Sequence, residues 1–226
     1  FTGYLWLFDF GVRESVVKYV AQYHASGQRD ELVATVRTAL SVYTVVGVVA
    51  LLCVGGLTVA MPYVFNVPAE AVSTARITAF IAGATIAQSF VSNVFVGILL
   101  GLQRSYRLVR VNIVLAVVRS TILDVLLING YGIIALAVVQ FGMSIASSVM
   151  VYRLCREELP YLTARLIRPE RGRVLKLLHY GKYVLISNIG DKIIFATDSM
   201  VVAAYLPISM LTYYAIGGSL IEYFRS

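Results

Sequence analysis

Several polar side chains of types that bind ligands occur inside long stretches of apolar sequence. The candidate substrate-binding residues are Arg13, Arg119, Lys192, Gln88 and Asn93. Arginine suits an anionic group, because its planar fork donates two charge-assisted hydrogen bonds. The two amides belong to a polar patch at helical spacing, and they either face the same cavity or form hydrogen bonds between helices. These residues predict a polar, cationic cavity within an apolar protein.

Acidic side chains accompany the basic ones at similar depth. They are Asp9, Glu14, Asp124, Asp191 and Asp198. A charge at the centre of a membrane-spanning helix costs roughly 2.5–3.5 kcal/mol on insertion scales, so such residues are functional candidates. The acids either balance the cavity charge or bind a coupling H⁺ or Na⁺. Asp9 and Arg13 are spaced i, i+4, as are Glu14 and Lys18, and each pair can therefore meet on one helix face.

Arg119 and Asp124 lie five residues apart, about 140° around a helix, so they cannot pair well with each other. Arg119 therefore needs a partner on another helix, or water. In the last long apolar stretch, Asp191 and Asp198 are seven residues apart and share a face, with Lys192 beside them. Several helices that each carry a polar stripe imply a shared polar interior.

Catalytic and metal-binding patterns are not evident. His24 and His179 are far apart and poor in neighbouring ligands, and Cys53 and Cys155 lack metal-ligand spacing. No nucleophile is spaced to meet a general base. We therefore predict that the protein is not an enzyme, has no catalytic residue and binds no metal or organic cofactor.

The elements that must position these residues are membrane-spanning helices. Hydrophobic residues make up 59% of the chain and charged residues 14%, against roughly 45–50% and 25% in soluble domains. Residues 39–61 and 77–103 carry no charge, and each run exceeds the ~20 residues needed to cross a bilayer. We predict an all-α polytopic transmembrane bundle of about seven spans. The predicted spans are residues 2–23, 36–61, 75–102, 109–128, 133–152, 174–205 and a truncated one from 208.

Lysine and arginine gather at every second connection between these spans. The basic connections fall within 18–37, 104–110 and 153–176, and the intervening turns, at 62–75, 129–132 and 205–209, contain neither residue. This is the positive-inside pattern, which predicts a multi-pass protein of the cell inner (plasma) membrane with the basic loops cytoplasmic. The net charge of +7 then favours anionic lipid headgroups, and not nucleic acid, as the partner.

The stretch 153–173 resembles a linker between two membrane bundles, because it is charged and holds Pro160, Pro169 and Gly172. We therefore predict an N-terminal membrane lobe at 1–152, a cytoplasmic basic linker at 153–173 and the truncated start of a C-terminal lobe at 174–226. Residue 1 lies inside an apolar segment with no basic region before it, so we interpret the chain as an internal fragment.

Five segments together carry a family resemblance. They are residues 7–11 (LFDFG), 17–23 (VKYVAQY), 97–104 (GILLGLQR) and 129–132 (NGYG), and Asp198 after the linker. In this order and spacing the chain resembles the polysaccharide-export branch of the multidrug/oligosaccharidyl-lipid/polysaccharide exporter superfamily, the O-antigen and exopolysaccharide flippases.

The resemblance implies a two-lobed exporter of twelve or more helices that works by alternating access, with this chain covering the second helix through part of the eighth. It implies that the cargo is an undecaprenyl-diphosphate-linked oligosaccharide, moved from the inner to the outer leaflet for surface polysaccharide (lipopolysaccharide or exopolysaccharide) synthesis. The implied partners are this lipid-linked oligosaccharide, membrane lipids and the polysaccharide polymerase machinery. The resemblance transfers no catalytic residue.

Three alternatives stay open. A cation-coupled multidrug exporter of the same superfamily would place acids in an otherwise apolar cavity, whereas this chain has arginines beside the acids. A membrane-embedded polymerase or glycosyltransferase usually needs a sizeable polar loop or domain to hold its chemistry, and the outer turns here are short. A non-transporting scaffold of a polysaccharide assembly complex would not need polar stripes on several helices.

Overall fold

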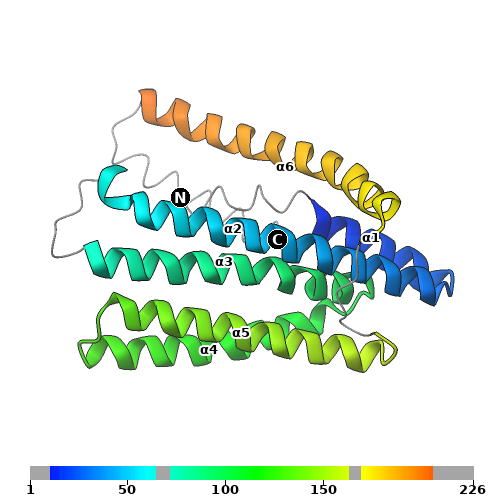
Figure 1. The fold of residues 1–226 in the computed structure, drawn as a ribbon, viewed down its shortest axis with the longest axis horizontal. Helices are drawn as coiled ribbons and strands as arrows, with labels where there is room; N and C mark the ends of the chain where they lie inside the picture. The colour runs from blue at the N-terminus through cyan, green and yellow to red at the C-terminus, as the bar shows by residue number, and fades with distance from the viewer. Residues whose placement is uncertain (1–10, 65–71, 163–168, 206–226) are drawn as a thin grey trace. The chain divides into compact units, whose positions relative to one another are not determined.

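The computed structural model describes residues 11–64, 72–162 and 169–205, and these residues form helices with no strand. The helices are α1 (Val12–Ala25), α2 (Arg29–Val64), α3 (Val72–Gly101), α4 (Ser105–Ile128), α5 (Ile133–Glu158) and α6 (Arg171–Tyr205) (Figure 1). The chain divides into two compact units, residues 1–181 and 182–226, so the boundary falls within α6. The first turns of α6 therefore belong to the same unit as α1 to α5.

Four helices are long and apolar enough to cross a membrane. These candidate spans are Arg29–Val59, Val72–Gly101, Ser105–Ile128 and Ile133–Glu158. The all-helical membrane fold is therefore confirmed for the described part of the chain. The total of about seven spans and the fragment interpretation stay predictions, because residues 1–10 and 206–226 lie outside the described residues.

Helices extend beyond the apolar runs that predicted them. α2 begins at Arg29, where we predicted residue 36, and α5 continues to Glu158, where we predicted residue 152. α6 begins at Arg171, inside the predicted linker. The added turns are rich in arginine and glutamate, which are good helix formers. Hydropathy marks only the part of a helix that suits hydrocarbon, and it misses the turns that project into the headgroup region.

The predicted span 2–23 is not one continuous helix. α1 begins only at Val12, and Gly11 before it has φ of 64°, a left-handed conformation that glycine adopts without steric cost. A Cβ atom at Gly11 would collide with the backbone carbonyl oxygen of Gly181 in α6. Residue 11 therefore requires glycine for both its backbone angle and its close contact with α6.

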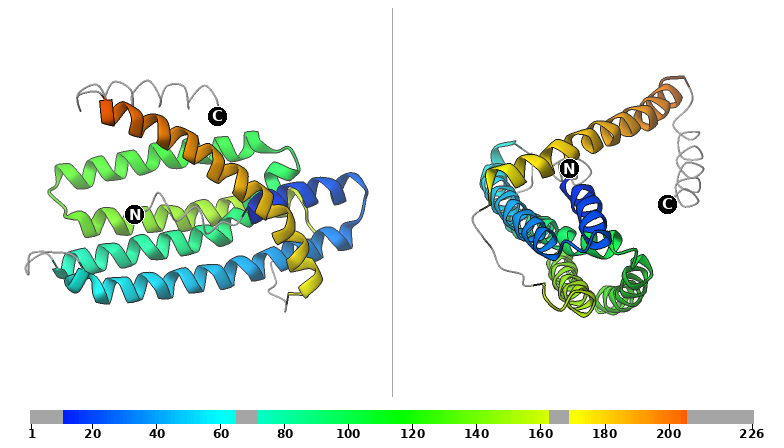
Figure 2. Two further views of the ribbon diagram at one scale, coloured as in Figure 1. Left: turned by 90° about the horizontal axis from the view of Figure 1, so that it is seen from above. Right: turned by 90° about the vertical axis from the view of Figure 1, so that its right-hand side faces the viewer.

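Within the first unit α3 is the central helix, packing against α1, α2 and α5, while α4 packs mainly on α5 (Figures 1 and 2). The buried core gathers where α1 ends and α2 begins, and it includes Val16, Val20, Val36, Tyr43, Val94 and Ile98. Only Leu108 is buried in α4. The exposed apolar side chains of α4 suit contact with lipid, which is as apolar as they are.

The motif Gly97-x-x-x-Gly101 makes a close contact between two helices of this chain. A Cβ atom at Gly101 would lie 2.7 Å from the carbonyl oxygen of Val17, and one at Gly97 would lie 3.2 Å from the carbonyl oxygen of Arg13. Small residues in membrane helices allow backbones to approach in this way. The motif therefore serves the packing of α3 on α1.

An arginine near the start of α3 completes the hydrogen bonding of α2. Pro62 lies within α2 and has no backbone N–H, so it cannot donate to the carbonyl oxygen of Thr58 four residues earlier. The guanidinium of Arg76 supplies the missing donor, with Nε 3.1 Å from the oxygen of Thr58 and Nη2 3.1 Å from the oxygen of Val59. Arg76 therefore satisfies a carbonyl that a proline leaves without its helical partner.

We expect Arg76→Gln to destabilise the protein by about 1 kcal/mol, because it removes a charge-assisted bond from a carbonyl that lacks its helical donor. The loss should shrink in a Pro62→Ala background, where residue 62 regains its N–H. The free energy of unfolding in detergent, measured for both single variants and the double variant, tests this coupling. Equal losses in the two backgrounds would contradict it.

Candidate functional site

Arg13 and Glu14 form an ion pair at the start of α1. The Arg13 Nε and Nη2 atoms lie 3.0 and 2.7 Å from Oε1 of Glu14. The other carboxylate oxygen of Glu14 is buried and has no hydrogen-bond partner. Glu14 and Lys18, whose i, i+4 spacing allows them to meet, do not pair: the Lys18 ammonium lies over the ring of Tyr180, 4.1 Å from its centroid. Glu14 therefore pairs with the adjacent residue of α1, and Lys18 contacts a side chain of α6, although the two residues have the i, i+4 spacing.

Arg119 lies near the middle of α4 and finds its partner on another helix, as predicted. Its Nη1 atom is 3.5 Å from Oε1 of Gln140 on α5. Asp124, on the same helix, is exposed and makes no hydrogen bond or ion pair with any described residue. Both charged residues lie off the packed core, on a helix long enough to span a membrane.

Gln88 bridges two helices. Its amide nitrogen donates to the hydroxyl of Ser148, and its carbonyl oxygen accepts a 2.6 Å bond from the hydroxyl of Ser144; both serines are on α5. This is the interhelical role that the sequence left open for the polar patch. Asn93 is half-buried on α3, and its side chain makes no hydrogen bond with a described residue. A role for Gln88 and Asn93 in binding substrate stays a prediction.

The remaining candidates lie outside the described residues. Asp9 precedes the described segment, and the side chains of Asp191, Lys192 and Asp198 are not described, although their backbone continues α6. The cavity that Arg13 and Arg119 were predicted to share is also untested. Arg13 is on α1, which packs on α2 and α3, whereas Arg119 is on α4, which packs mainly on α5.

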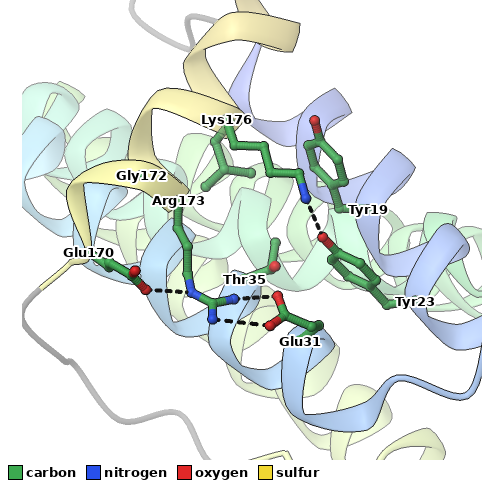
Figure 3. Close-up of a pocket in the computed structure, with 9 residues that line it drawn as sticks. Tyr19, Tyr23, Glu31, Thr35, Glu170, Gly172, Arg173 and Lys176 are labelled. Atoms are coloured by element: carbon green, nitrogen blue, oxygen red, sulfur yellow. Dashed lines mark hydrogen bonds and ion pairs between the residues drawn. The ribbon is translucent and has the colours of Figure 1, made fainter.

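A cavity of about 220 Å³ lies where α1 ends and α2 and α6 begin (Figure 3). We call it the basic-end cavity. Its lining residues come from all three helices and from the residues just before α6, and they are Tyr19, Tyr23, Glu31, Thr35, Glu170, Gly172, Arg173, Lys176 and Leu177. Two acids and two bases therefore face a space large enough for several water molecules.

Arg173 is held by two glutamates at once. Its Nη1 and Nη2 atoms lie 2.5 and 3.2 Å from the two carboxylate oxygens of Glu31 on α2, and its Nε lies 2.9 Å from Oε2 of Glu170 (Figure 3). These hydrogen bonds raise the pKa of Arg173 above its ordinary value. The guanidinium therefore stays charged, and each glutamate binds a different edge of it.

Further contacts hold the first turns of α6 against α1. The Lys176 ammonium donates a 2.6 Å hydrogen bond to the hydroxyl of Tyr23 and lies 5.0 Å from the ring centroid of Tyr19. The buried hydroxyl of Ser15 donates a 2.8 Å bond to the carbonyl oxygen of Leu177. The start of α6 is therefore attached to α1 by polar contacts, together with the core packing of Leu177 and the ring contact between Tyr180 and Tyr19.

Sequence reasoning did not identify this cluster. Tyr19 and Tyr23 have the i, i+4 spacing of an aromatic stripe, and interfacial tyrosines are common at membrane surfaces. Glu31 is an acid within a basic connection, which is a weak signal. Nothing in the sequence indicates that Glu31 meets Arg173, because 142 positions separate them.

The connection between α3 and α4 is tied to the end of α5 in a similar way. Arg107 pairs with Glu157 at 2.8 Å and with Glu158 at 3.2 Å, and Arg104 also reaches Glu158 at 3.2 Å. Exposed pairs of this kind contribute little to stability individually.

Among the described residues, no three His, Cys, Asp or Glu side chains come close enough together to hold a metal ion.

Long apolar helices joined by short connections define a helical membrane protein. The family model described as polysaccharide biosynthesis protein matches residues 1–221. The chain belongs to this family, and the predicted family resemblance is confirmed. Comparison with curated proteins and with solved structures gave no significant match.

Proposed function

We propose that this chain forms part of a transporter that moves an undecaprenyl-diphosphate-linked oligosaccharide from the inner to the outer leaflet by alternating access. The observation that carries the proposal is the family match over residues 1–221, on a chain whose helices are long enough to span a membrane. A polysaccharide precursor on a lipid carrier needs a protein that shelters its polar headgroup while its tail stays in lipid.

The charges support an anionic cargo and an outward direction. Arg119 is a permanent cation near the middle of a candidate span, and a guanidinium suits a diphosphate. The positive-inside pattern supports a cytoplasmic position for the basic-end cavity. An inside-negative potential of 100 mV then favours outward passage by about 2.3 kcal/mol per negative charge. Among the acids whose side chains the structure describes, Glu14 has a buried carboxylate oxygen without a hydrogen-bond partner, and it is our candidate for binding a coupling H⁺ or Na⁺.

A deletion strain tests this function. We expect it to accumulate the complete lipid-linked oligosaccharide, with surface polysaccharide lost, because synthesis on the inner leaflet continues while transfer stops. The sugar should react with an impermeant lectin in inside-out vesicles but not in right-side-out ones. Re-expression of the full-length protein should restore surface polysaccharide.

Other outcomes would point to other functions. Accumulation of an incomplete oligosaccharide would indicate a glycosyltransferase. Accumulation of single repeat units on the outer leaflet would indicate a polymerase. Unchanged lipid-linked oligosaccharide together with lost resistance to toxic compounds would indicate a multidrug exporter.

A further inference from the structure

We propose that Arg173 exchanges between two glutamate partners and so acts as a latch on the basic-end cavity: bound to Glu31 it holds the mouth closed, and bound to Glu170 alone it lets the mouth open. The proposal rests on the proposed function only for its purpose, which is to control entry of cargo from one side of the membrane. The latch itself is defined by contacts within the first compact unit.

The two glutamates differ in what their bonds connect. Glu31 is on α2, so its bidentate bond to Arg173 joins two helices that are far apart in the chain. Glu170 precedes α6 and is only three residues from Arg173, so their bond is local and can persist when α6 moves. Both acids line the same cavity (Figure 3).

The local partner lowers the cost of opening. A guanidinium that left Glu31 with no other acid nearby would lose its whole ion pair, whereas here the bond to Glu170 remains. The side chains of Arg173 and Glu31 are 30% and 44% exposed, so solvent screens the pair and the closed and open states differ only modestly. Two arrangements that differ only modestly in free energy are what a switching element requires.

The other contacts across this junction also suit an interface that separates. The Lys176 ammonium can exchange the hydroxyl of Tyr23 for water, and both groups lie at the cavity wall. Gly11 and Gly181 approach closely through backbone atoms without interlocking side chains. Leu177 is the only large apolar side chain of α6 that is fully buried among its described residues. Opening must therefore break the apolar contacts of Leu177 and of the partly buried Tyr180, whose ring meets that of Tyr19 edge-on.

The latch predicts opposite effects for two acids bonded to the same arginine. Removing the charge of Glu31 weakens the closed state, and removing that of Glu170 weakens the open state more than the closed one. A cysteine at Thr35, a buried residue of the cavity wall, reports opening through its rate of reaction with an impermeant thiol reagent. The full-length protein, with Cys53, Cys155 and any further native cysteine replaced, is labelled in inside-out membrane vesicles.

We expect Glu31→Gln to raise the labelling rate about two- to fivefold and Glu170→Gln to lower it by a similar factor, the range set by exposed ion pairs. Glu157→Gln is the matched control, since Glu157 pairs with Arg107 at the same end of the bundle but away from the cavity. It should leave the rate unchanged.

Changes in the same direction for both cavity acids, or no change in either, would overturn the latch. Faster labelling caused by misfolding is detected by size exclusion in detergent, and a folded Glu31→Asn variant then replaces the glutamine variant. Labelling only in right-side-out vesicles would overturn the cytoplasmic placement of the mouth. The readout is independent of transport, so failure of the latch and failure of the proposed cargo are distinguishable.

Discussion

Gly101→Ala should destabilise the protein by about 1–3 kcal/mol, which is the usual cost of overpacking a close contact. The added Cβ atom would lie 2.7 Å from the carbonyl oxygen of Val17 and 3.0 Å from Cβ of Val20. Backbone atoms cannot rotate away, so α1 and α3 must separate. Because α3 is the central helix of the first unit, Gly101→Val should leave little folded protein. Thermal unfolding in detergent and the monodisperse fraction on size exclusion measure both effects.

Gly142 on α5 is the matched control, because a Cβ atom there would meet nothing within 4 Å. Alanine is a better helix former than glycine by about 1 kcal/mol, so Gly142→Ala should be neutral or stabilising. Gly97→Ala should fall between the two, since its nearest contact is a side-chain atom of Val16 at 3.1 Å. The expected order, from most to least stable, is Gly142→Ala, Gly97→Ala, Gly101→Ala. Any other order would refute the close-contact role of the motif.

Arg119→Ala should abolish export of surface polysaccharide while the protein still inserts and folds. Arg119 lies off the packed core and has a single long contact with Gln140, so its loss removes little packing. A charge facing lipid at mid-span would cost roughly 2.5–3.5 kcal/mol, a cost that favours a polar surrounding and, in our proposal, the cargo diphosphate. Arg119→Lys should restore export only in part, because a point charge replaces a bidentate fork.

Arg110→Ala is the control on the same helix. Arg110 lies one turn into α4, with its guanidinium 5.4 Å from the ring centroid of Tyr106, at the depth of the basic connection. We expect near-normal export from this variant. Surface polysaccharide and the amount of protein in the membrane are measured together for the Arg119→Ala, Arg119→Lys and Arg110→Ala variants. Normal export by Arg119→Ala, at normal protein level, would remove this residue from the mechanism.

The sequence by itself determined the class of the protein. Apolar runs such as residues 77–103 predict spans, because every unpaired backbone group in hydrocarbon is costly and a helix satisfies all of them locally. The same local logic indicated that Arg119 needs a partner on another helix, or water, because Asp124 lies five residues away and cannot pair well with it. Five short segments were enough to indicate the family.

Tertiary structure decided which polar groups meet. The i, i+4 rule paired Glu14 with Lys18, but the folded chain gives Lys18 the ring of Tyr180 and leaves Glu14 with Arg13. Helical spacing predicts which residues share a face of one helix. It does not predict which side chains of another helix contact that face. For the same reason, the interhelical bonds of Gln88 were one of two open possibilities in the sequence.

The basic-end cavity depended entirely on the fold. Glu31 and Arg173 appear in the sequence as ordinary members of charged connections, and they become partners because the first turn of α6 lies beside the start of α2. Arg76 is likewise a lone charge at the edge of a span until α3 places it beside the carbonyl that Pro62 leaves without a donor. Local patterns report which residues suit a membrane helix, whereas contacts between distant residues depend on how the helices pack, which no single helix encodes.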